Sequence, residues 1–178
     1  MSHRLSLIIG SIAVIAAQVA YAQKDVASCK ALLDAFAKQA VTPYHMSGTT
    51  TTPGTGGKPR ASELISAGGQ HYVMSEGHWV RSPMTPAQMA AQQQENIRTA
   101  TAFLCRRIRD ESVGGQAAVV YSEHSENEGI KADAQVWIAK GSGLVLRSEM
   151  DMDPGDVDQT HISTRYDYTN VQPPAGVH

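Results

Sequence analysis

Histidines and clustered aspartates are the side chains of this 178-residue sequence best suited to binding a metal ion. The histidines form no H-E-x-x-H motif and no other pair at helical spacing, so they predict no zinc or copper site. Asp151, Asp153, Asp156 and Asp158 surround a Pro-Gly turn, but they lack the ligand order and closing glutamate of an EF-hand loop. We interpret this run as a solvated acidic turn, with weak calcium binding as the alternative, and expect no cofactor.

Catalytic nucleophiles and phosphate-binding loops have no better support in the sequence. There is no G-x-S-x-G motif, and neither cysteine lies in a protease-like context. The glycines before Lys58 resemble a phosphate-binding loop, but Pro59 follows the lysine and Thr52 stands where that motif requires its first glycine. We expect a hairpin tip there and no catalytic residues. An enzyme would need a polar cluster with shifted pKa values in a cleft, which no local motif indicates.

The N-terminus has the layout of a secretory signal peptide. A short segment carrying Arg4 is followed by an apolar stretch over residues 5–19 and then by Ala20-Tyr21-Ala22. We expect residues 1–22 to be a signal peptide cleaved after Ala22, which would place the protein in the periplasm. An uncleaved anchor is the alternative, but the apolar stretch is short for a membrane span. Lipidation is not expected, because Gln23 rather than a cysteine follows the cut.

Cysteine usage and charge narrow the class of protein further. Two cysteines in an exported chain usually pair, so Cys29 and Cys105 are expected to form a disulfide bond. No CxxC motif points to redox or metal-binding thiols. Removing residues 1–22 takes away Arg4 and leaves 14 basic against 17 acidic residues, a balance that argues against a nucleic-acid partner. Residues 23–178 have the length of one domain.

Apolar spacing predicts two helices that would hold the cysteines. Residues 26–40 repeat apolar side chains every three or four positions. A second helix begins at Thr85, an N-cap candidate with Pro86 at the first helical position and Gln88 three residues after the cap. We expect it to continue to about residue 106 or 107. Cys105 would then lie on this helix, and the disulfide would hold the two helices together.

The rest of the chain alternates polar and apolar residues between glycine-rich turns, as β-strands do. Expected strands lie at 49–52, 61–67, 70–75, 78–81, 109–113, 116–124, 131–139, 144–153 and 160–168. Short turns between them predict an antiparallel meander, so the fold class is α+β. On one strand Leu144, Leu146, Met150 and Met152 share a face. Methionine suits surfaces that accept varied apolar partners, but such a face is more often ordinary core.

Three of these segments resemble the C-terminal half of LolA/LolB-like periplasmic carriers, a family that includes LppX/LprG-like lipid-binding proteins. They read Val-Trp-Ile at 136–138, Gly-Leu-Val-Leu-Arg at 143–147 and Arg-Tyr-Asp-Tyr-Thr-Asn-Val at 165–171. Tyr72-Val73, Trp79 and the first helix fit the same order of elements. The resemblance implies a strongly curved antiparallel sheet that forms an unclosed half-barrel, with two helices as a lid over a concave face that holds acyl chains.

The sequence therefore predicts a non-enzymatic periplasmic carrier for an apolar, lipid- or acyl-like ligand. The alternative is an envelope adaptor with a filled core that docks on another envelope protein. Neither would keep a membrane-spanning segment after processing. The presence of a continuous apolar cavity beneath the helices would distinguish the two. The expected ligand-binding residues are Met74, Trp79, Val136, Ile138, Leu144, Leu146 and Met150.

Overall fold

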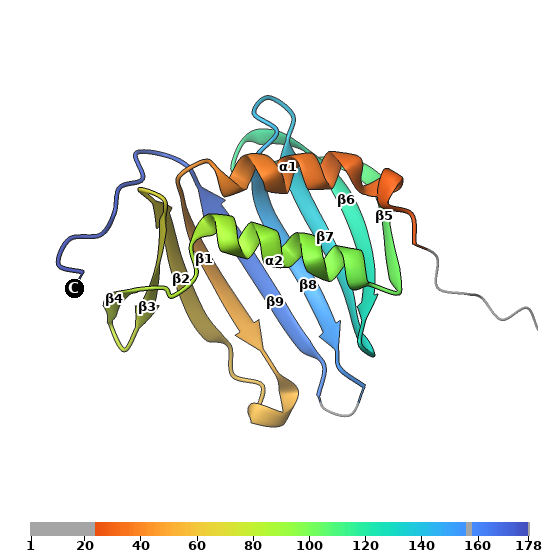
Figure 1. The fold of residues 1–178 in the computed structure, drawn as a ribbon, viewed down its shortest axis with the longest axis horizontal. Coiled ribbons are helices and arrows are strands. Elements are labelled where there is room, and N and C mark those ends of the chain that lie inside the picture. Colours follow the sequence, from red (N-terminus) through yellow and green to blue (C-terminus); the bar gives the residue numbers. More distant parts are fainter. Residues whose placement is uncertain (1–23, 156–157, 178) are drawn as a thin grey trace, which may run out of the picture.

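A nine-stranded antiparallel sheet carries two helices side by side across one of its faces (Figure 1). The computed structural model describes residues 24–155 and 158–177, so the predicted signal peptide at 1–22 lies outside the described residues. The helical elements are η1 Val26–Cys29, α1 Lys30–Ala40, η2 Pro53–Thr55 and α2 Pro86–Thr99. The strands are β1 Tyr44–Thr51, β2 Arg60–Ala67, β3 Gln70–Ser75, β4 His78–Arg81, β5 Ala102–Val113, β6 Gln116–Asn127, β7 Ile130–Ala139, β8 Val145–Asp153 and β9 Thr160–Asp167.

The sheet consists of two meanders joined in the middle. Strands β1 to β4 form one and β5 to β9 form the other, and the first strand pairs with the last to give the order β4-β3-β2-β1-β9-β8-β7-β6-β5. Strands β4 and β5 are the two edges, so the sheet is not closed. This confirms the α+β class and the unclosed antiparallel sheet with two helices. The strength of its curvature stays a prediction.

Helix α1 is firmly attached to the inner face of the sheet, the face that the helices cover. Leu32 and Ala35 are buried, and Leu33 and Phe36 pack against the same core. This core also contains Val136, Ile138 and Val145 of the sheet, and it lies at the end of the sheet near β5. The predicted helical periodicity of this segment is thus confirmed, with a turn of 3-10 helix at its start.

Residues 24–29 lie along strand β5 and tie the start of α1 to it. The Asp25 amide donates to the Phe103 carbonyl at 2.8 Å, and the Cys105 amide donates to the Ser28 hydroxyl at 3.0 Å. The predicted disulfide between Cys29 and Cys105 is present, and both cysteines are buried. The N-terminal end of α1 is therefore held by backbone, side-chain and covalent contacts together.

Helix α2 begins as predicted and ends earlier than predicted. Thr85 and Gln88 form a reciprocal capping box, and Pro86 is at the first helical position. The helix stops at Thr99, and Cys105 lies on strand β5, so the expectation that the disulfide joins two helices was wrong. The reason is tertiary: from Ala102 onward alternate residues bury Phe103 and Cys105, and the backbone pairs along β6.

The outer face of the sheet has a small apolar cluster of its own. Trp137, Val120 and Leu146 are buried there with Ala118 and Ala139. The guanidinium groups of Arg147 and Arg109 lie 4.6 Å and 5.7 Å from the centre of the Trp137 ring. These cation–π contacts cover the indole, so the outer cluster is closed by side chains of the sheet itself.

The disulfide gives the first testable prediction. Its cysteines are separated by 76 positions, and in the chain-entropy model opening such a loop releases conformational freedom in the unfolded state. We expect the double change Cys29→Ala and Cys105→Ala to lower the free energy of unfolding by about 2–5 kcal/mol, measured by urea denaturation. Val41→Ala is the control, because Val41 is 83% exposed and its truncation should change little. An unchanged urea midpoint in the double variant would contradict the prediction.

Candidate functional site

Helix α2 crosses the inner face of the sheet without burying any of its residues (Figure 1). Its contact with the core comes through Ile97, near its C-terminal end, while Met89, near its N-terminal end, is 40% exposed. Interiors of folded proteins are normally packed as densely as organic crystals. A helix that covers a sheet but does not pack into it therefore leaves space beneath.

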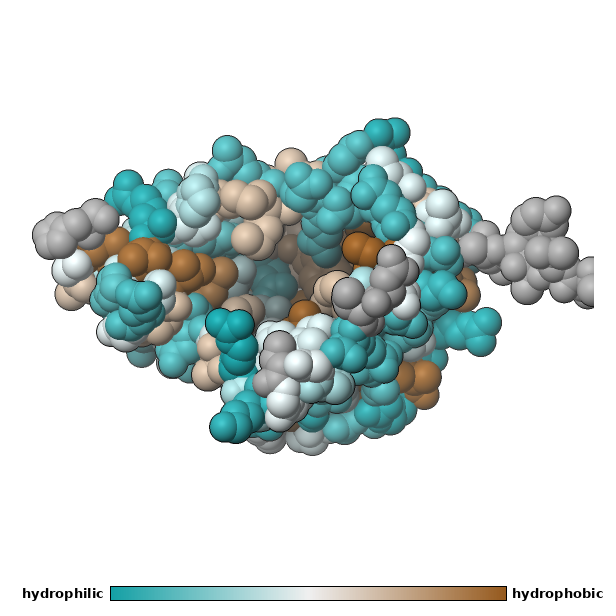
Figure 2. Space-filling view, turned by 90° about the horizontal axis from the view of Figure 1, so that it is seen from below, coloured by the Kyte–Doolittle hydropathy of each residue, from teal (hydrophilic) through white to brown (hydrophobic). Residues whose placement is uncertain are grey.

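A central cavity of about 350 Å³ occupies this space. Its roof is formed by α1 and α2, and its floor by inner-face residues of strands β1, β3 and β6 to β9. Seen from below, the molecule is hollowed near the middle of the view, and hydrophobic residues lie at the opening (Figure 2). The apolar lining residues are Phe36, Ala40, Pro86, Met89, Ala90, Ala134, Val136, Met150 and Ile162.

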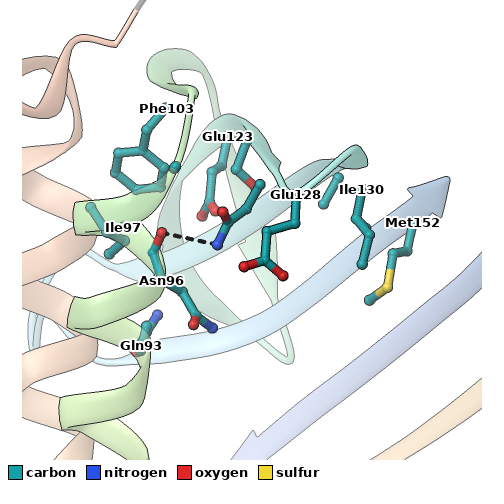
Figure 3. A pocket seen from close by; sticks show the side chains of 12 residues that line it. Gln93, Asn96, Ile97, Phe103, Glu123, Glu128, Ile130 and Met152 are labelled. Atoms are coloured by element: carbon teal, nitrogen blue, oxygen red, sulfur yellow. Dashed lines mark hydrogen bonds between the residues drawn. The ribbon is translucent and has the colours of Figure 1, made fainter. Parts of the chain in front are cut away.

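A side cavity of about 420 Å³ lies between the C-terminal half of α2 and strands β5 to β8. Ile97, Phe103, Ile130 and Met152 give it an apolar wall (Figure 3). Its polar residues include Asn96 and Asn127, whose side-chain amide donates to the Asn96 carbonyl at 3.5 Å. The two cavities share Gln93 and Glu123 in their linings, so they adjoin at these two side chains.

Glu123, where the two cavities adjoin, is an acidic residue in a largely apolar surrounding. It lies on β6 between Tyr121 and Ser125, on the face turned toward the helices, and the described residues offer its carboxyl group no hydrogen bond or ion pair. Burial raises the pKa of Glu123 to about 7 from its ordinary value of 4.5, because the surroundings disfavour the charged form. The site therefore contains a carboxyl group that is close to half ionised at neutral pH.

A second polar group lies at the other end of the central cavity. The Tyr44 hydroxyl is 3.5 Å from His71 Nε2, and the Tyr44 ring lies edge-on to Tyr166 with their centres 5.6 Å apart. Burial, with a contribution from Tyr166, raises the pKa of Tyr44 to about 12, and burial lowers the pKa of His71. Gln39 Nε2 and His71 Nδ1 are buried without a hydrogen-bond partner among the described residues. Polar atoms thus flank the apolar lining at this end too.

The sequence-predicted ligand residues fall into two groups. Val136 and Met150 line the central cavity, and Ile138 belongs to the inner core beside it. Met74 and Trp79 face each other across β3 and β4. Because His71 of β3 faces inward, alternation puts Met74 and its partner on the outer face.

A β-bulge separates Leu144 and Leu146 from the methionines with which they were grouped. The register between β7 and β8 shifts between Trp137 and Ile138, and Val145 rather than Leu146 enters the inner core. Leu146 packs in the outer cluster with Trp137, and Leu144 lies in the turn before β8, where its carbonyl accepts from the Ala139 amide. The structure thus groups Val136 and Met150 at the cavity and leaves the other five residues away from its lining.

Sequence reasoning missed Glu123, Tyr44 and His71 as candidate residues. Strand β6 carries polar residues on both faces near Glu123, so alternation gives no signal for which of them point inward. Only the register of the strands identifies them.

As for metal sites, the described part of the chain contains no group of three or more His, Cys, Asp or Glu residues able to hold an ion. The acidic run cannot be followed completely, because Asp156 lies outside the described residues.

Comparison with known proteins gives similarity in fold. No protein-family model and no curated protein matches the sequence. Among solved structures, the lipoprotein LppX of Mycobacterium tuberculosis is 11% identical, with a TM-score of 0.47 over 84% of this chain and 99% of that one. LprF from Mycobacterium bovis is 10% identical (TM-score 0.44; 85% and 98%), and a LolA superfamily protein from Nitrosomonas europaea is 9% identical (TM-score 0.29; 85% and 96%). Of these three, the Nitrosomonas europaea protein is described as a LolA superfamily protein, and at such identities the likeness concerns the fold alone.

The raised pKa of Glu123 predicts a specific dependence of stability on pH. The unfolded chain ionises this carboxyl group near pH 4.5 and the folded chain near pH 7, so stability falls as pH rises between these values and stays low above them. Glu123→Gln keeps a neutral side chain of the same shape. We expect this variant to be more stable than the wild type above pH 7, by up to about 3 kcal/mol, since one pKa unit corresponds to about 1.4 kcal/mol.

Urea denaturation of both proteins between about pH 5 and pH 8 measures this difference. Glu126→Gln on the same strand is the matched control, because alternation turns residue 126 to the outer face. The difference in the free energy of unfolding between the wild type and Glu123→Gln should grow as the pH rises. The difference between the wild type and Glu126→Gln should not grow in this way. A constant difference across the range would rule out the assigned ionisation.

Proposed function

We propose that this protein is a non-enzymatic carrier that binds an apolar, lipid- or acyl-like ligand between its helices and its sheet, and that it works in the periplasm after export. The observation that carries the proposal is the apolar cavity left beneath α2, a helix that buries none of its own residues. A cavity of this size, mostly apolar with a few polar groups, is typical of small-molecule sites.

The two helices would contribute differently to ligand binding. Helix α1 is held to the sheet by Leu32 and by the disulfide at Cys29, so it provides a fixed wall. Helix α2 contributes Met89, Ala90 and Gln93 to the cavity lining from an element with little burial. An apolar ligand would supply the missing packing partner for α2, and removing its surface from water would favour binding.

Other features of the chain agree with this use. The resemblance of the sequence to LolA/LolB-like carriers implies a ligand at the same place, between helices and sheet. The residue types at the N-terminus and the disulfide suit an exported protein. No helix within the described residues is both long enough and apolar enough to cross a membrane.

Filling the central cavity should abolish ligand binding. Ala134 lies on β7 opposite Met150, and both line the cavity. We expect Ala134→Phe to weaken binding of the neutral apolar dye N-phenyl-1-naphthylamine by at least about tenfold, because the ring takes the ligand's space. Dye fluorescence measures the effect. Ala134→Leu serves as a smaller replacement if the phenylalanine variant does not fold.

The matched control is Lys131→Phe, which adds the same ring on the same strand but on the outer face, where residue 131 is exposed. This variant should bind the dye as the wild type does. Native mass spectrometry of protein purified from the cell envelope would then identify a natural ligand, released on organic extraction. Failure of the wild type to bind dye or lipid, or equal binding by Ala134→Phe, would reject the carrier and favour an adaptor with a filled core.

A further inference from the structure

The charged side chains that line the two cavities are all acidic among the described residues. Among the described residues that line them, Glu123 and Glu128 are acidic, and none is a lysine or an arginine. The other titratable residues in the linings are Tyr44, His71 and Tyr166. Glu123 lies where the cavities adjoin, and Glu128 lies exposed at the outer end of the side cavity, in the turn between β6 and β7 (Figure 3).

We propose that the ligand is an amphiphile with an amine head group, whose ammonium is received by Glu123 while its apolar chain lies in the central cavity. This inference rests on the proposed carrier function and adds the chemical class of the ligand. An ammonium group donates three hydrogen bonds and carries the charge opposite to that of a carboxylate.

The geometry favours this head group over the common anionic ones. A carboxylate or phosphate head would enter a space lined by two acidic side chains and no basic one, which is unfavourable at low dielectric. The Glu123 carboxyl group lies where the two cavities adjoin and has no hydrogen-bond or ion-pair partner among the described residues, and burial raises its pKa.

The position of Glu123 also fits the length of an amphiphile. From the junction of the cavities, an apolar chain can extend past Ala134, Val136 and Met150 toward the group at Tyr44 and His71. In the other direction, the polar side chains Asn96 and Asn127 lead toward Glu128 at the exposed end. The head group therefore meets carboxylates, and the chain meets the apolar lining.

A series of ligands with one chain and three heads tests the proposal. Dodecylamine, dodecanol and dodecanoate are compared, each below its aggregation concentration, by displacement of N-phenyl-1-naphthylamine at about pH 8, where an alkyl amine is still charged. We expect the wild type to bind dodecylamine about tenfold more tightly than dodecanol, and dodecanoate most weakly. In Glu123→Gln, dodecylamine and dodecanol should bind within about twofold of each other, while Glu126→Gln should keep the wild-type order.

The outcomes separate the inference from the carrier function. Equal binding of the three compounds, tightest binding of dodecanoate, or an amine preference that survives in Glu123→Gln would overturn the amine inference and leave the carrier standing. Failure of all three compounds and of the dye to bind would overturn both. The expected order, lost only in Glu123→Gln, would support both.

Discussion

The attachment of residues 24–29 to strand β5 is the contact on which the rest of this arrangement depends. The disulfide from Cys29 to Cys105 and the hydrogen bonds of Asp25 and Ser28 fix where α1 begins, and Leu32 then directs the helix onto the sheet. Helix α2 buries none of its residues and is attached near its C-terminal end, through Ile97 and through hydrogen bonds from Asn127 to Asn96 and Thr99. One helix is thus held close to the sheet and the other bridges a gap, and this difference creates the cavity.

The two faces of the sheet differ in how their apolar residues are covered. The outer face covers its apolar residues with its own long side chains, as Arg147 and Arg109 do over Trp137. The inner face places small residues such as Ala132 and Ala134 beneath α2, and this leaves volume instead of filling it. Among the described residues, the Glu123 carboxyl group on that face has no hydrogen-bond or ion-pair partner. Empty volume and an unpaired carboxyl group therefore occur on the same side of the sheet.

Much of the fold could be predicted from the sequence, because its signals are local. The glycine turns and alternating strands mark the meanders, and the Thr85–Gln88 capping box marks the start of α2. The end of α2 could not be predicted, since pairing with β6 decides that Phe103 and Cys105 belong to a strand. The site was predictable only in part. Val136 and Met150 follow from alternation, Leu146 is displaced by a bulge, and Glu123 is identified only by strand register.

The pairing of β1 with β9 has a consequence for how the chain folds. Each meander can form from neighbouring strands, but the middle of the sheet is completed only when Met46 meets Tyr166, from opposite ends of the domain. Contacts between such distant residues close large loops, which slows folding. Until the last strand is available, β1 presents an open edge to other chains. A growing chain therefore cannot complete the middle of its sheet until β9 has been made and can pair with β1.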